Sequence, residues 1–428
     1  MTSNQDFFKE RLYEEQPNKP EDDRGAYQRD RARIMHSAGF RRLQGKTQVM
    51  GTGEGDFHRT RLTHSIEVAQ IGYGLLGVLE KHKDQHNPAL QGWLPDRDLI
   101  EAACLAHDLG HPPFGHKGEQ ALHRAMLDHG GFEGNGQTLR ILTKLEKYKE
   151  RGKGLYPTRR LVLAVLKYPC AIDAFDLASH QIKPPKCYHN EEKEVVTWAL
   201  RGFSEADQKE FQQVECGKPK HHSFDCSILE LADDIAYGIH DIEDIIARNL
   251  ASADEVRVEV GKAFNKIGGS ITQGERVFDA VAICDGLLGD SFARKQMISN
   301  LVNLFITNVI IASNDVFEHP LLRFNAKFPD THEKLLIALK LLAWDLVIKK
   351  AKVQQLEWRG QRIVSQLFEV LVSSPEALVP PSSWKDGCLD SSKERRVCDY
   401  IAGMTDNYAE KLHKRLFQPG FGSSGDEL

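Results

Sequence analysis

The sequence predicts an all-α protein with at most minor β-hairpins. Apolar residues recur at the helical period over segments of roughly ten to twenty residues, and few runs alternate β-branched with polar residues. The 428 residues are 41% hydrophobic and 27% charged, which is ordinary for a chain that buries a sizeable core. This length allows two or three domains, or one large helical domain.

Charge and cysteine content exclude several classes of protein. Lysine and arginine total 56 and aspartate and glutamate total 61, so the net charge of −5 argues against a general binder of nucleic acid or anionic membranes. No run approaches the roughly 18 apolar residues of a membrane-spanning helix, and residues 1–11 show no apolar signal region. The 8 cysteines are too sparse for a disulfide framework. We therefore expect reduced thiols and a cytoplasmic protein without membrane association.

In chain order, the first predicted elements are an arm, a basic helix and a loop. Residues 1–23 are polar and are expected to form an N-terminal arm. Residues 27–40 have no helix breaker before Gly39 and are rich in arginine, which predicts a basic helix. Four glycines between residues 45 and 56 indicate a loop or a short hairpin.

Helices are predicted for most of the remaining chain. The apolar spacing over residues 66–79 suits a helix that ends near His82. Asp98 is a plausible cap for a helix over residues 99–109, which a glycine and two prolines then stop. Further helices are predicted over residues 137–150, 159–167, 227–250, 254–266, 272–288, 292–313, 331–351, 355–373 and 392–416. Residues 45–58 and 256–260 are the best candidates for minor strands.

The strongest local signal is an adjacent histidine and aspartate at the end of an apolar helix. His107 and Asp108 open the run His-Asp-Leu-Gly-His-Pro-Pro-Phe-Gly-His, which ends at His116. Burying an imidazole and a carboxylate together costs several kcal/mol unless something pairs with them. A divalent cation binds both groups and offsets this cost. The alternative is a capping aspartate and a core histidine that share hydrogen bonds.

Two other predicted helices carry polar groups on faces that should point inward. His64 lies on the apolar stripe of its helix. Asp233, Tyr237 and Asp241 follow one another at intervals of four residues, so they share one face of another helix. Acidic groups on an inward face need a cation or a polar ligand. Asp234, one step round the helix, is expected to be solvated.

A second metal site is a weaker hypothesis. Cys216, His221, His222 and Cys226 fall within eleven residues and could in principle form a Cys2His2 zinc site. The spacing lacks the paired Cys-x2-Cys of structural zinc motifs, and the segment is rich in Lys, Gly and Pro. A loop with ordinary thiols is the favoured interpretation.

Six blocks of the sequence carry a further signal, and they comprise residues 40–49, 60–68, 107–119, 132–135, 232–237 and 399–406. Together they closely resemble the bacterial deoxyguanosinetriphosphate triphosphohydrolase-like family, which belongs to the HD-domain superfamily of metal-dependent phosphohydrolases. The resemblance implies an HD-domain helical core over residues 24–290 and a C-terminal α-helical region over 291–418 packed on it. The sequence itself predicts a disordered tail over 419–428. It also implies the superfamily's four metal ligands, which match His64, His107, Asp108 and Asp233.

The resemblance implies an activity as well. Family members cleave a dNTP to the deoxynucleoside and inorganic triphosphate, through attack of a metal-activated water at the α-phosphorus. One divalent ion per site is implied, from among Mg, Mn, Fe, Co and Ni. Arg61 matches a phosphate-contacting arginine. His116 and Glu119 resemble a His–Glu pair that moves a proton to the 5′-oxygen or takes one from water, and His111 is a further candidate catalytic residue.

Sugar recognition follows from the same resemblance. Gln48 and Val49 match positions where an amide reads the 3′-hydroxyl and an apolar side chain packs under the deoxyribose. Tyr237 and Asp241 match a tyrosine that walls the sugar and an acid that accepts the 3′-hydroxyl. Vertebrate relatives carry a basic residue where this chain has Asp234, so a phosphate contact must come from elsewhere. The candidates are Lys167, Lys186 and Arg396.

Two other functions are weighed against this one. An HD-family phosphatase or phosphodiesterase for nucleoside monophosphates or cyclic nucleotides would share the metal ligands but would not need Gln48, Tyr237 and Asp241. A regulatory or nucleic-acid-binding protein with a vestigial site is supported only by the arginine-dense residues 24–42. Because family members tend to be homo-oligomers, we expect a homo-oligomer with a hexamer favoured. A dNTP substrate is expected, and a nucleotide effector and single-stranded DNA are candidate partners.

Overall fold

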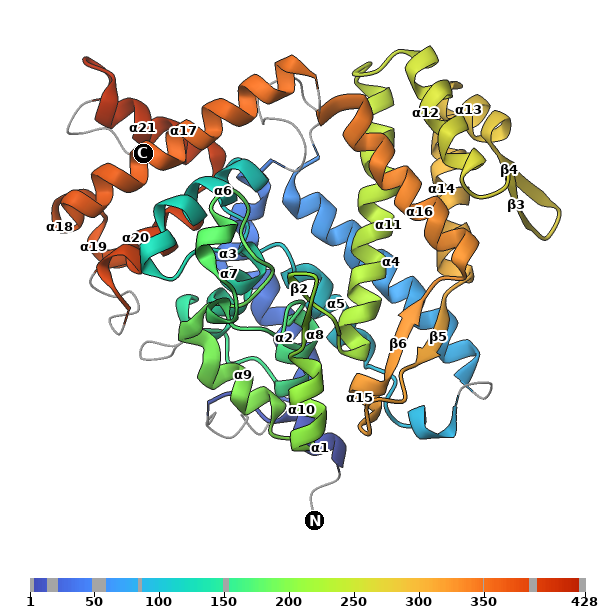
Figure 1. Cartoon of the computed structure of the whole chain (residues 1–428), viewed down its shortest axis with the longest axis horizontal. Helices are drawn as coiled ribbons and strands as arrows, with labels where there is room; N and C mark the ends of the chain where they lie inside the picture. Colours follow the sequence, from blue (N-terminus) through green and yellow to red (C-terminus); the bar gives the residue numbers. More distant parts are fainter. Residues whose placement is uncertain are drawn as a thin grey trace.

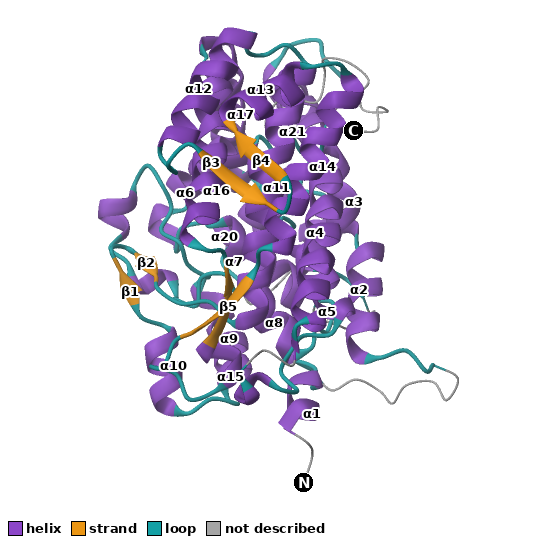
Figure 2. Cartoon of the chain, turned by 90° about the vertical axis from the view of Figure 1, so that its right-hand side faces the viewer, coloured by secondary structure: helices purple, strands orange, loops and turns teal. Residues whose placement is uncertain are grey.

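The computed structural model describes residues 4–13, 22–47, 59–83, 87–148, 154–348, 350–384 and 391–422 (Figure 1). Helices dominate this part of the chain, and the named strands within it form three small antiparallel sheets of two strands each (Figure 2). The prediction of an all-α protein with minor β-hairpins is therefore confirmed. None of the helices in these ranges combines the length and the apolarity needed to cross a membrane.

The first helices of the chain are α1 (Asn4–Lys9), α2 (Ala26–His36), α3 (Ala38–Arg42), α4 (Arg61–Lys81), α5 (Arg97–Ala106), α6 (Gly115–Ala125), α7 (Gly134–Arg140), α8 (Arg159–Val165), α9 (Lys193–Leu200) and α10 (Glu205–Phe211). They are followed by α11 (Phe224–Ala247), α12 (Ala253–Asn265), α13 (Ala280–Leu288), α14 (Ser291–Thr307), α15 (Pro320–Arg323), α16 (Asp330–Ala343), α17 (Ala351–Ser373), α18 (Pro375–Leu378), α19 (Pro381–Trp384), α20 (Lys393–Ala402) and α21 (Asp406–Phe417). The strand pairs are β1 (Val214–Glu215) with β2 (Lys218–Pro219), β3 (Ser270–Gln273) with β4 (Arg276–Asp279), and β5 (Ile310–Ser313) with β6 (Phe324–Lys327).

Helices α4, α5 and α11 pack against one another and share the main hydrophobic core. Helix α4 begins after Thr60, whose hydroxyl accepts a hydrogen bond from the Thr63 backbone and so satisfies one exposed N–H of the first turn. Its buried face carries His64 together with apolar side chains such as Ile71. The predicted end near His82 is confirmed, since His82 is the C-terminal cap.

Several predicted details are wrong. Asp96, not Asp98, caps α5, because the Asp96 side chain accepts the N–H of Asp98. Residues 256–260 are not a strand: they lie within α12, where Val256 and Val260 are buried four residues apart on one helix face. Three predicted helices are shorter or broken. The segment 272–288 begins in the β3–β4 hairpin, 292–313 ends in β5, and 392–416 breaks between α20 and α21.

A second core joins α6 to the C-terminal helices. Helix α17 packs against α6 and also against α20 and α21, and Figure 1 shows α17 running past α6. The cluster includes Leu122, Phe132, Val364, Leu367, Val397 and Ile401. At the other end of the molecule, α1 lies within the segment predicted as an arm and buries Phe8 against α8 and its neighbours. Helix α6 therefore packs on a helix that begins more than 200 positions later in the sequence.

Candidate metal centre and active site

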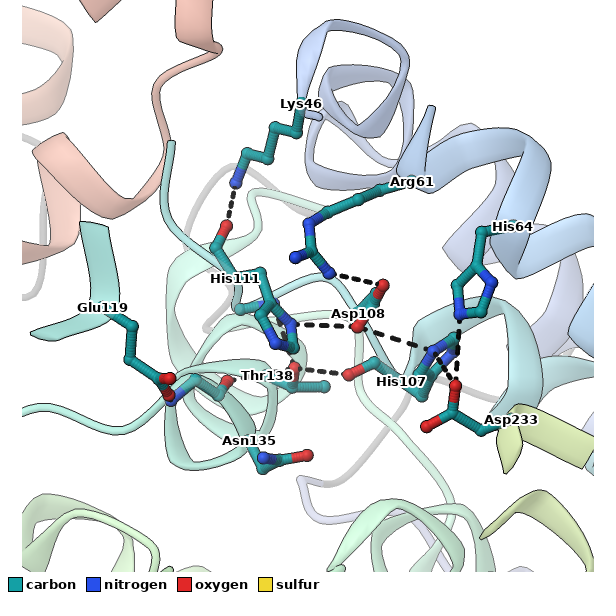
Figure 3. Close-up of polar contacts among 12 residues, drawn as sticks. Lys46, Arg61, His64, His107, Asp108, His111, Glu119, Asn135, Thr138 and Asp233 are labelled. Carbon is teal, nitrogen blue, oxygen red and sulfur yellow. Dashed lines mark hydrogen bonds and ion pairs between the residues drawn. The ribbon is translucent and has the colours of Figure 1, made fainter. Parts of the chain in front are cut away.

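Four side chains that are distant in sequence meet where three helices come together (Figure 3). His64 lies on α4, His107 and Asp108 follow α5, and Asp233 lies on α11. His64 Nε2 lies 3.1 Å from Asp233 Oδ1, and His107 Nε2 lies 3.5 Å from Asp108 Oδ1 and 3.6 Å from Asp233 Oδ1. One ligand atom from each of His64, His107 and Asp108 lies within 4.8 Å of the others. The folded chain thus gathers two imidazoles and two carboxylates.

The donor set fits a divalent metal ion. The Nδ1 of His107 lies 2.7 Å from the carbonyl of Cys104, so it carries the proton and leaves the lone pair on Nε2. That Nε2 is buried and has no hydrogen-bond partner. Burial lowers the pKa of His64, which favours the neutral imidazole that a metal requires. A buried nitrogen lone pair beside two carboxylates is the environment that an ion such as Mn²⁺ or Mg²⁺ satisfies.

Both carboxylates of this centre are held in the ionised form. Burial alone would raise the pKa of Asp108, but Arg61, His107 and His111 outweigh it and hold that pKa well below its usual range. The pKa of Asp233 is lowered for the same reason, with His107, the hydrogen-bonded His64 and a nearby lysine outweighing burial. The centre therefore carries negative charge that a cation can offset.

Each oxygen of the Asp108 carboxylate is contacted by a neighbouring side chain. Arg61 Nη1 lies 2.7 Å from Asp108 Oδ2, and His111 Nδ1 lies 2.9 Å from Asp108 Oδ1. Burial and the charge of Arg61 lower the pKa of His111 to about 4, so this imidazole is neutral at physiological pH. Arg61 was predicted to contact phosphate, and His111 was predicted to be catalytic. Both thus lie directly against Asp108, a candidate metal ligand.

His116 and Glu119 form a pair on the first turn of α6. His116 Nδ1 lies 3.3 Å from Glu119 Oε2, and the His116 side chain is 70% exposed. The other oxygen of Glu119 accepts the Gly134 N–H at 2.8 Å, which fixes the carboxylate. Burial opposes ionisation of Glu119, but Lys186 and His116 outweigh it and lower its pKa. The anchored Glu119 carboxylate thus orients the accessible His116 imidazole, whose ring centre lies 5.8 Å from that of His111.

The residues predicted to recognise the sugar divide into two groups. Gln48 and Val49 lie outside the described residues. Tyr237 and Asp241 lie on α11, one and two turns beyond Asp233. Burial raises the pKa of Tyr237 to about 12. Burial also raises the pKa of Asp241 to about 7, although Arg59 Nη1 lies 3.2 Å from its carboxylate.

Two of the three candidate phosphate contacts lie near the centre. Lys167 Nζ lies 3.6 Å from Asp233 Oδ2, and Lys186 Nζ lies 2.9 Å from Glu133 Oε1 and contributes to the charge felt by Glu119. Arg396 lies elsewhere, with its guanidinium 3.7 Å from the centre of the Trp384 ring. Asp234, expected to be solvated, instead forms an ion pair with Lys340 of α16.

The second cysteine and histidine cluster does not form a site. Cys216 is exposed in the β1–β2 turn, Cys226 is buried within α11, and His221 pairs with Glu210 at 3.1 Å. All four residues are described, and no three of them bring ligand atoms within reach of one another. The favoured interpretation of this segment, ordinary thiols in a loop, agrees with this arrangement.

Arginines gather around a cavity whose lining also includes Lys46 and Leu109, behind the loop that carries Asp108 and His111. It has a volume of about 1300 Å³ and is bounded by α2, α3, the residues after α7, and α20. Its lining contains six arginines, Arg24, Arg29, Arg33, Arg41, Arg42 and Arg396, against the acids Asp22, Glu146 and Asp399. The arginine-dense segment of the sequence therefore concentrates positive charge at one concave surface.

Several residues that hold the site in shape were not predicted. Thr138 of α7 accepts the Gly110 N–H at 2.9 Å and lies 3.0 Å from the His107 carbonyl. Arg59 ties Asp241 to Glu67. Arg59 directly precedes the block at residues 60–68, and this position was the signal that could have identified it.

Comparison with known proteins agrees with this geometry. The HD-domain family model matches residues 61–167, and the model of the phosphohydrolase-associated domain matches residues 326–415. Helical fold, paired histidine and aspartate, and these matches together define a metal-dependent phosphohydrolase of the HD class.

Similar proteins extend over almost the whole chain. The deoxyguanosinetriphosphate triphosphohydrolase-like protein of Shewanella baltica OS223 is 43% identical over 99% of this chain and 98% of its own length. Proteins of the same name from Shewanella pealeana and Shewanella oneidensis are 42% and 41% identical, over 96% and 97% of this chain and 96% and 98% of their own lengths. The chain belongs to the deoxyguanosinetriphosphate triphosphohydrolase-like family.

Proposed function

We propose that this protein hydrolyses deoxynucleoside triphosphates to the deoxynucleoside and inorganic triphosphate. The observation that carries the proposal is the meeting of two imidazoles and two carboxylates in a buried centre close to a His–Glu pair. The substrate class is supported by the name that the near full-length relatives carry.

His64, His107, Asp108 and Asp233 would hold one divalent ion. When bound, such an ion lowers the pKa of water and offsets charge on phosphoryl oxygens. The unpartnered Nε2 of His107 supports the fit. Two imidazoles and two carboxylates accept Mg, Mn, Fe, Co or Ni, so the donor set leaves the choice of ion to availability and geometry.

The His116–Glu119 pair supplies the proton chemistry in this proposal. The oxygen of water bonds to the α-phosphorus, the bond from the α-phosphorus to the 5′-oxygen breaks, and the 5′-oxygen takes up a proton while the water loses one. His116 is exposed enough to reach substrate and is oriented by Glu119, so it carries one of these protons. The neutral His111 imidazole lies beside His116 and adds a second polar ring to the site.

Cationic side chains around the centre would bind the triphosphate. Arg61 is buried against Asp108, and Lys167 lies against Asp233. The pKa of Lys167 stays above its usual range, because Glu230, Tyr168 and Asp233 outweigh the effect of burial. These fixed positive charges stabilise the charge that develops on phosphoryl oxygens during hydrolysis.

Tyr237 and Asp241 would contact the deoxyribose. Both lie on the face of α11 that also presents Asp233, so a sugar bound there stands beside the reacting phosphate. A carboxylate that accepts the 3′-hydroxyl and a ring packed beside the sugar discriminate by shape and hydrogen bonding. Gln48 and Val49 remain predicted sugar contacts.

The experiment is a panel of dNTPs, NTPs, nucleoside monophosphates and cyclic nucleotides, each assayed with each divalent metal, with phosphorus NMR of the products. Deoxynucleoside and inorganic triphosphate from dGTP or another dNTP supports the proposal. Orthophosphate from monophosphates, or ring opening of cyclic nucleotides, with no triphosphate from any dNTP, supports the alternative phosphatase or phosphodiesterase.

The arginine-lined cavity supports a binding site for an anionic effector. We propose that it takes the nucleotide effector expected for this family, since six arginines face a volume large enough for a nucleotide. Replacing the exposed Arg41 and Arg42 with alanine should abolish any activation of dNTP hydrolysis by a second nucleotide and leave unactivated turnover intact. The homo-oligomer, with a hexamer favoured, and single-stranded DNA binding stay predictions.

A further inference from the structure

Three segments meet behind the loop that joins the metal ligands to α6. Lys46 Nζ donates to the carbonyl of His111 at 2.5 Å and to the carbonyl of Ala402, at the end of α20, at 2.9 Å. The next residue, Thr47, donates its backbone N–H to Asp406 Oδ2 at 3.0 Å, and its hydroxyl donates to the same oxygen. The other oxygen of Asp406 accepts the N–H of Phe114 at 2.9 Å.

The Asp406 carboxylate is therefore shared between two loops. It is 5% exposed, and it lies at the first position of α21, more than 290 residues after Phe114 in the chain. Each of its oxygens accepts at least one hydrogen bond, from a different loop. A buried carboxylate that receives backbone N–H groups from two segments fixes the distance between those segments.

Phe114 needs such support because its backbone is strained. Its φ of 62° and ψ of 26° lie in the left-handed region, which a bulky residue rarely adopts. A strained residue of this kind persists only where the surroundings over-determine its conformation. Here the Asp406 bond holds its N–H, and its ring packs so tightly against α17 that a Cβ on Gly360 would lie 2.6 Å from it.

The conformation of Phe114 decides where His116 points. Phe114 is the N-terminal cap of α6, and His116 is the second residue of that helix. The His116 side chain is 70% exposed, and its contact with Glu119 on the same helix holds it relative to α6 rather than relative to the metal centre. The direction in which α6 leaves the loop thus sets the position of the imidazole relative to the metal centre.

We propose that Asp406 is a positioning residue for His116, through which the C-terminal helices set the geometry of proton transfer. This inference rests on the proposed function for its kinetic readout. Asp406 binds Thr47 and Phe114, and its bond to the Phe114 N–H links it to the first turn of α6.

The test uses the full-length protein with Asp406→Asn, which keeps the shape of the side chain but cannot accept hydrogen bonds at both ends. We expect kcat for dNTP hydrolysis to fall about 100-fold with KM and bound metal little changed, because a small misplacement of a catalytic group has this cost. In a His116→Gln background the same substitution should lower kcat by no more than about threefold, because the group that it positions is already absent.

Hydrogen exchange provides a readout that does not need activity. The backbone amides of residues 111–117 other than the two prolines should exchange faster in Asp406→Asn than in the wild type, while those of α4 should not change. Asp207→Asn is the matched control. Asp207 is likewise buried and accepts two backbone N–H groups at 2.9 Å, from Glu318 and His319, but it lies away from α6. We expect the control to lower stability without affecting residues 111–117.

The outcomes separate the two proposals. A wild-type protein that releases no triphosphate from any dNTP overturns the proposed function, while unchanged exchange in residues 111–117 of Asp406→Asn overturns this inference whatever the activity. Losses that multiply with His116→Gln also overturn it, because they show a general structural role. Should Asp406→Asn not fold, Asp406→Glu takes its place, since it keeps the charge but displaces the acceptor from Phe114.

Discussion

The chain contains two clusters of potential metal ligands. The fold brings the side chains of the first cluster together and leaves those of the second apart. His64, His107, Asp108 and Asp233 span 170 residues of sequence, yet the fold brings them together. The second cluster spans only residues 216–226, yet its thiols and imidazoles point to different surroundings. Closeness in sequence is therefore a poor guide to a metal site when ligands are not spaced along one turn or hairpin.

Convergence of ligand groups on a buried unpaired atom is the better guide, since His222 Nδ1 of the second cluster is also buried without a partner but no three ligand groups of that cluster meet. His107 Nε2 is buried without a partner, whereas His221 Nε2 already has Glu210 at 3.1 Å. A buried lone pair without a partner costs free energy that a bound cation returns, and a paired imidazole offers no such gain.

The largest effect is expected from Asp233→Ala. Removing a ligand leaves the remaining groups unable to hold the ion firmly, and loss of the ion should lower hydrolysis by roughly a thousandfold or more. Metal analysis of the purified protein and product assays measure this. The matched control is Asp234→Ala on the same helix, whose carboxylate pairs with Lys340, and it should keep the ion and the activity. Equal losses from both variants would contradict the assignment.

His116→Gln should separate chemistry from metal binding. Because a positioned acid or base contributes about 10²–10⁴-fold, kcat should fall within that range while metal content matches the wild type. His129→Gln serves as the control, since that exposed imidazole lies 3.9 Å from Glu394, in the turn that follows the end of α6. Retention of full activity by His116→Gln would show that another group moves the proton.

These two variants test site residues that were already predicted from the sequence. The helical period predicted α4, α5 and α11 and put His64 and Asp233 on inward faces. The β3–β4 hairpin was not predicted from this period, because the turn at Gly274 interrupts a segment whose apolar spacing also suits a helix. The period is a local property, and a hairpin is decided by pairing across the turn.

Contacts between residues far apart in the chain could not be predicted from the sequence either. The block at residues 399–406 resembles the family, yet nothing in it indicates that Asp406 binds Thr47 and Phe114. Likewise Arg61 could be assigned to phosphate by resemblance, but its ion pair with Asp108 needs the folded arrangement of α4 and α5. Side-chain chemistry shows which groups need partners, and only the fold shows which partners they find.

A smaller effect concerns the pH dependence of stability through Asp241. Its pKa in the folded protein is raised to about 7, first by burial, so the folded state binds a proton that the unfolded state releases near pH 4. This contribution to stability is fully present below about pH 4 and is lost as pH rises through about 7, at about 1.4 kcal/mol per pH unit at most. Urea unfolding of the metal-free protein measures it.

Asp241→Asn should lack this dependence. Between pH 5 and pH 8 the wild type should lose stability relative to the variant, and the two curves should converge in slope above pH 8. Asp244→Asn on the next turn of α11 is a useful comparison, since burial also raises the pKa of Asp244. If wild type and Asp241→Asn keep a constant difference over this range, Asp241 does not titrate there.

The smallest effect is expected at the second cluster. Cys216→Ser replaces an exposed thiol, so metal content and activity should both match the wild type. Elemental analysis for zinc before and after the substitution checks this. Loss of an equivalent of zinc on replacing Cys216 would erase the contrast between the two clusters.

The central claim is that His64, His107, Asp108 and Asp233 jointly bind one ion, and anomalous diffraction from crystals grown with Mn²⁺ tests it most directly. We expect a single strong anomalous peak per chain within bonding distance of all four side chains, and its disappearance in Asp233→Ala. A peak elsewhere, or none near these residues in an active protein, would contradict the account.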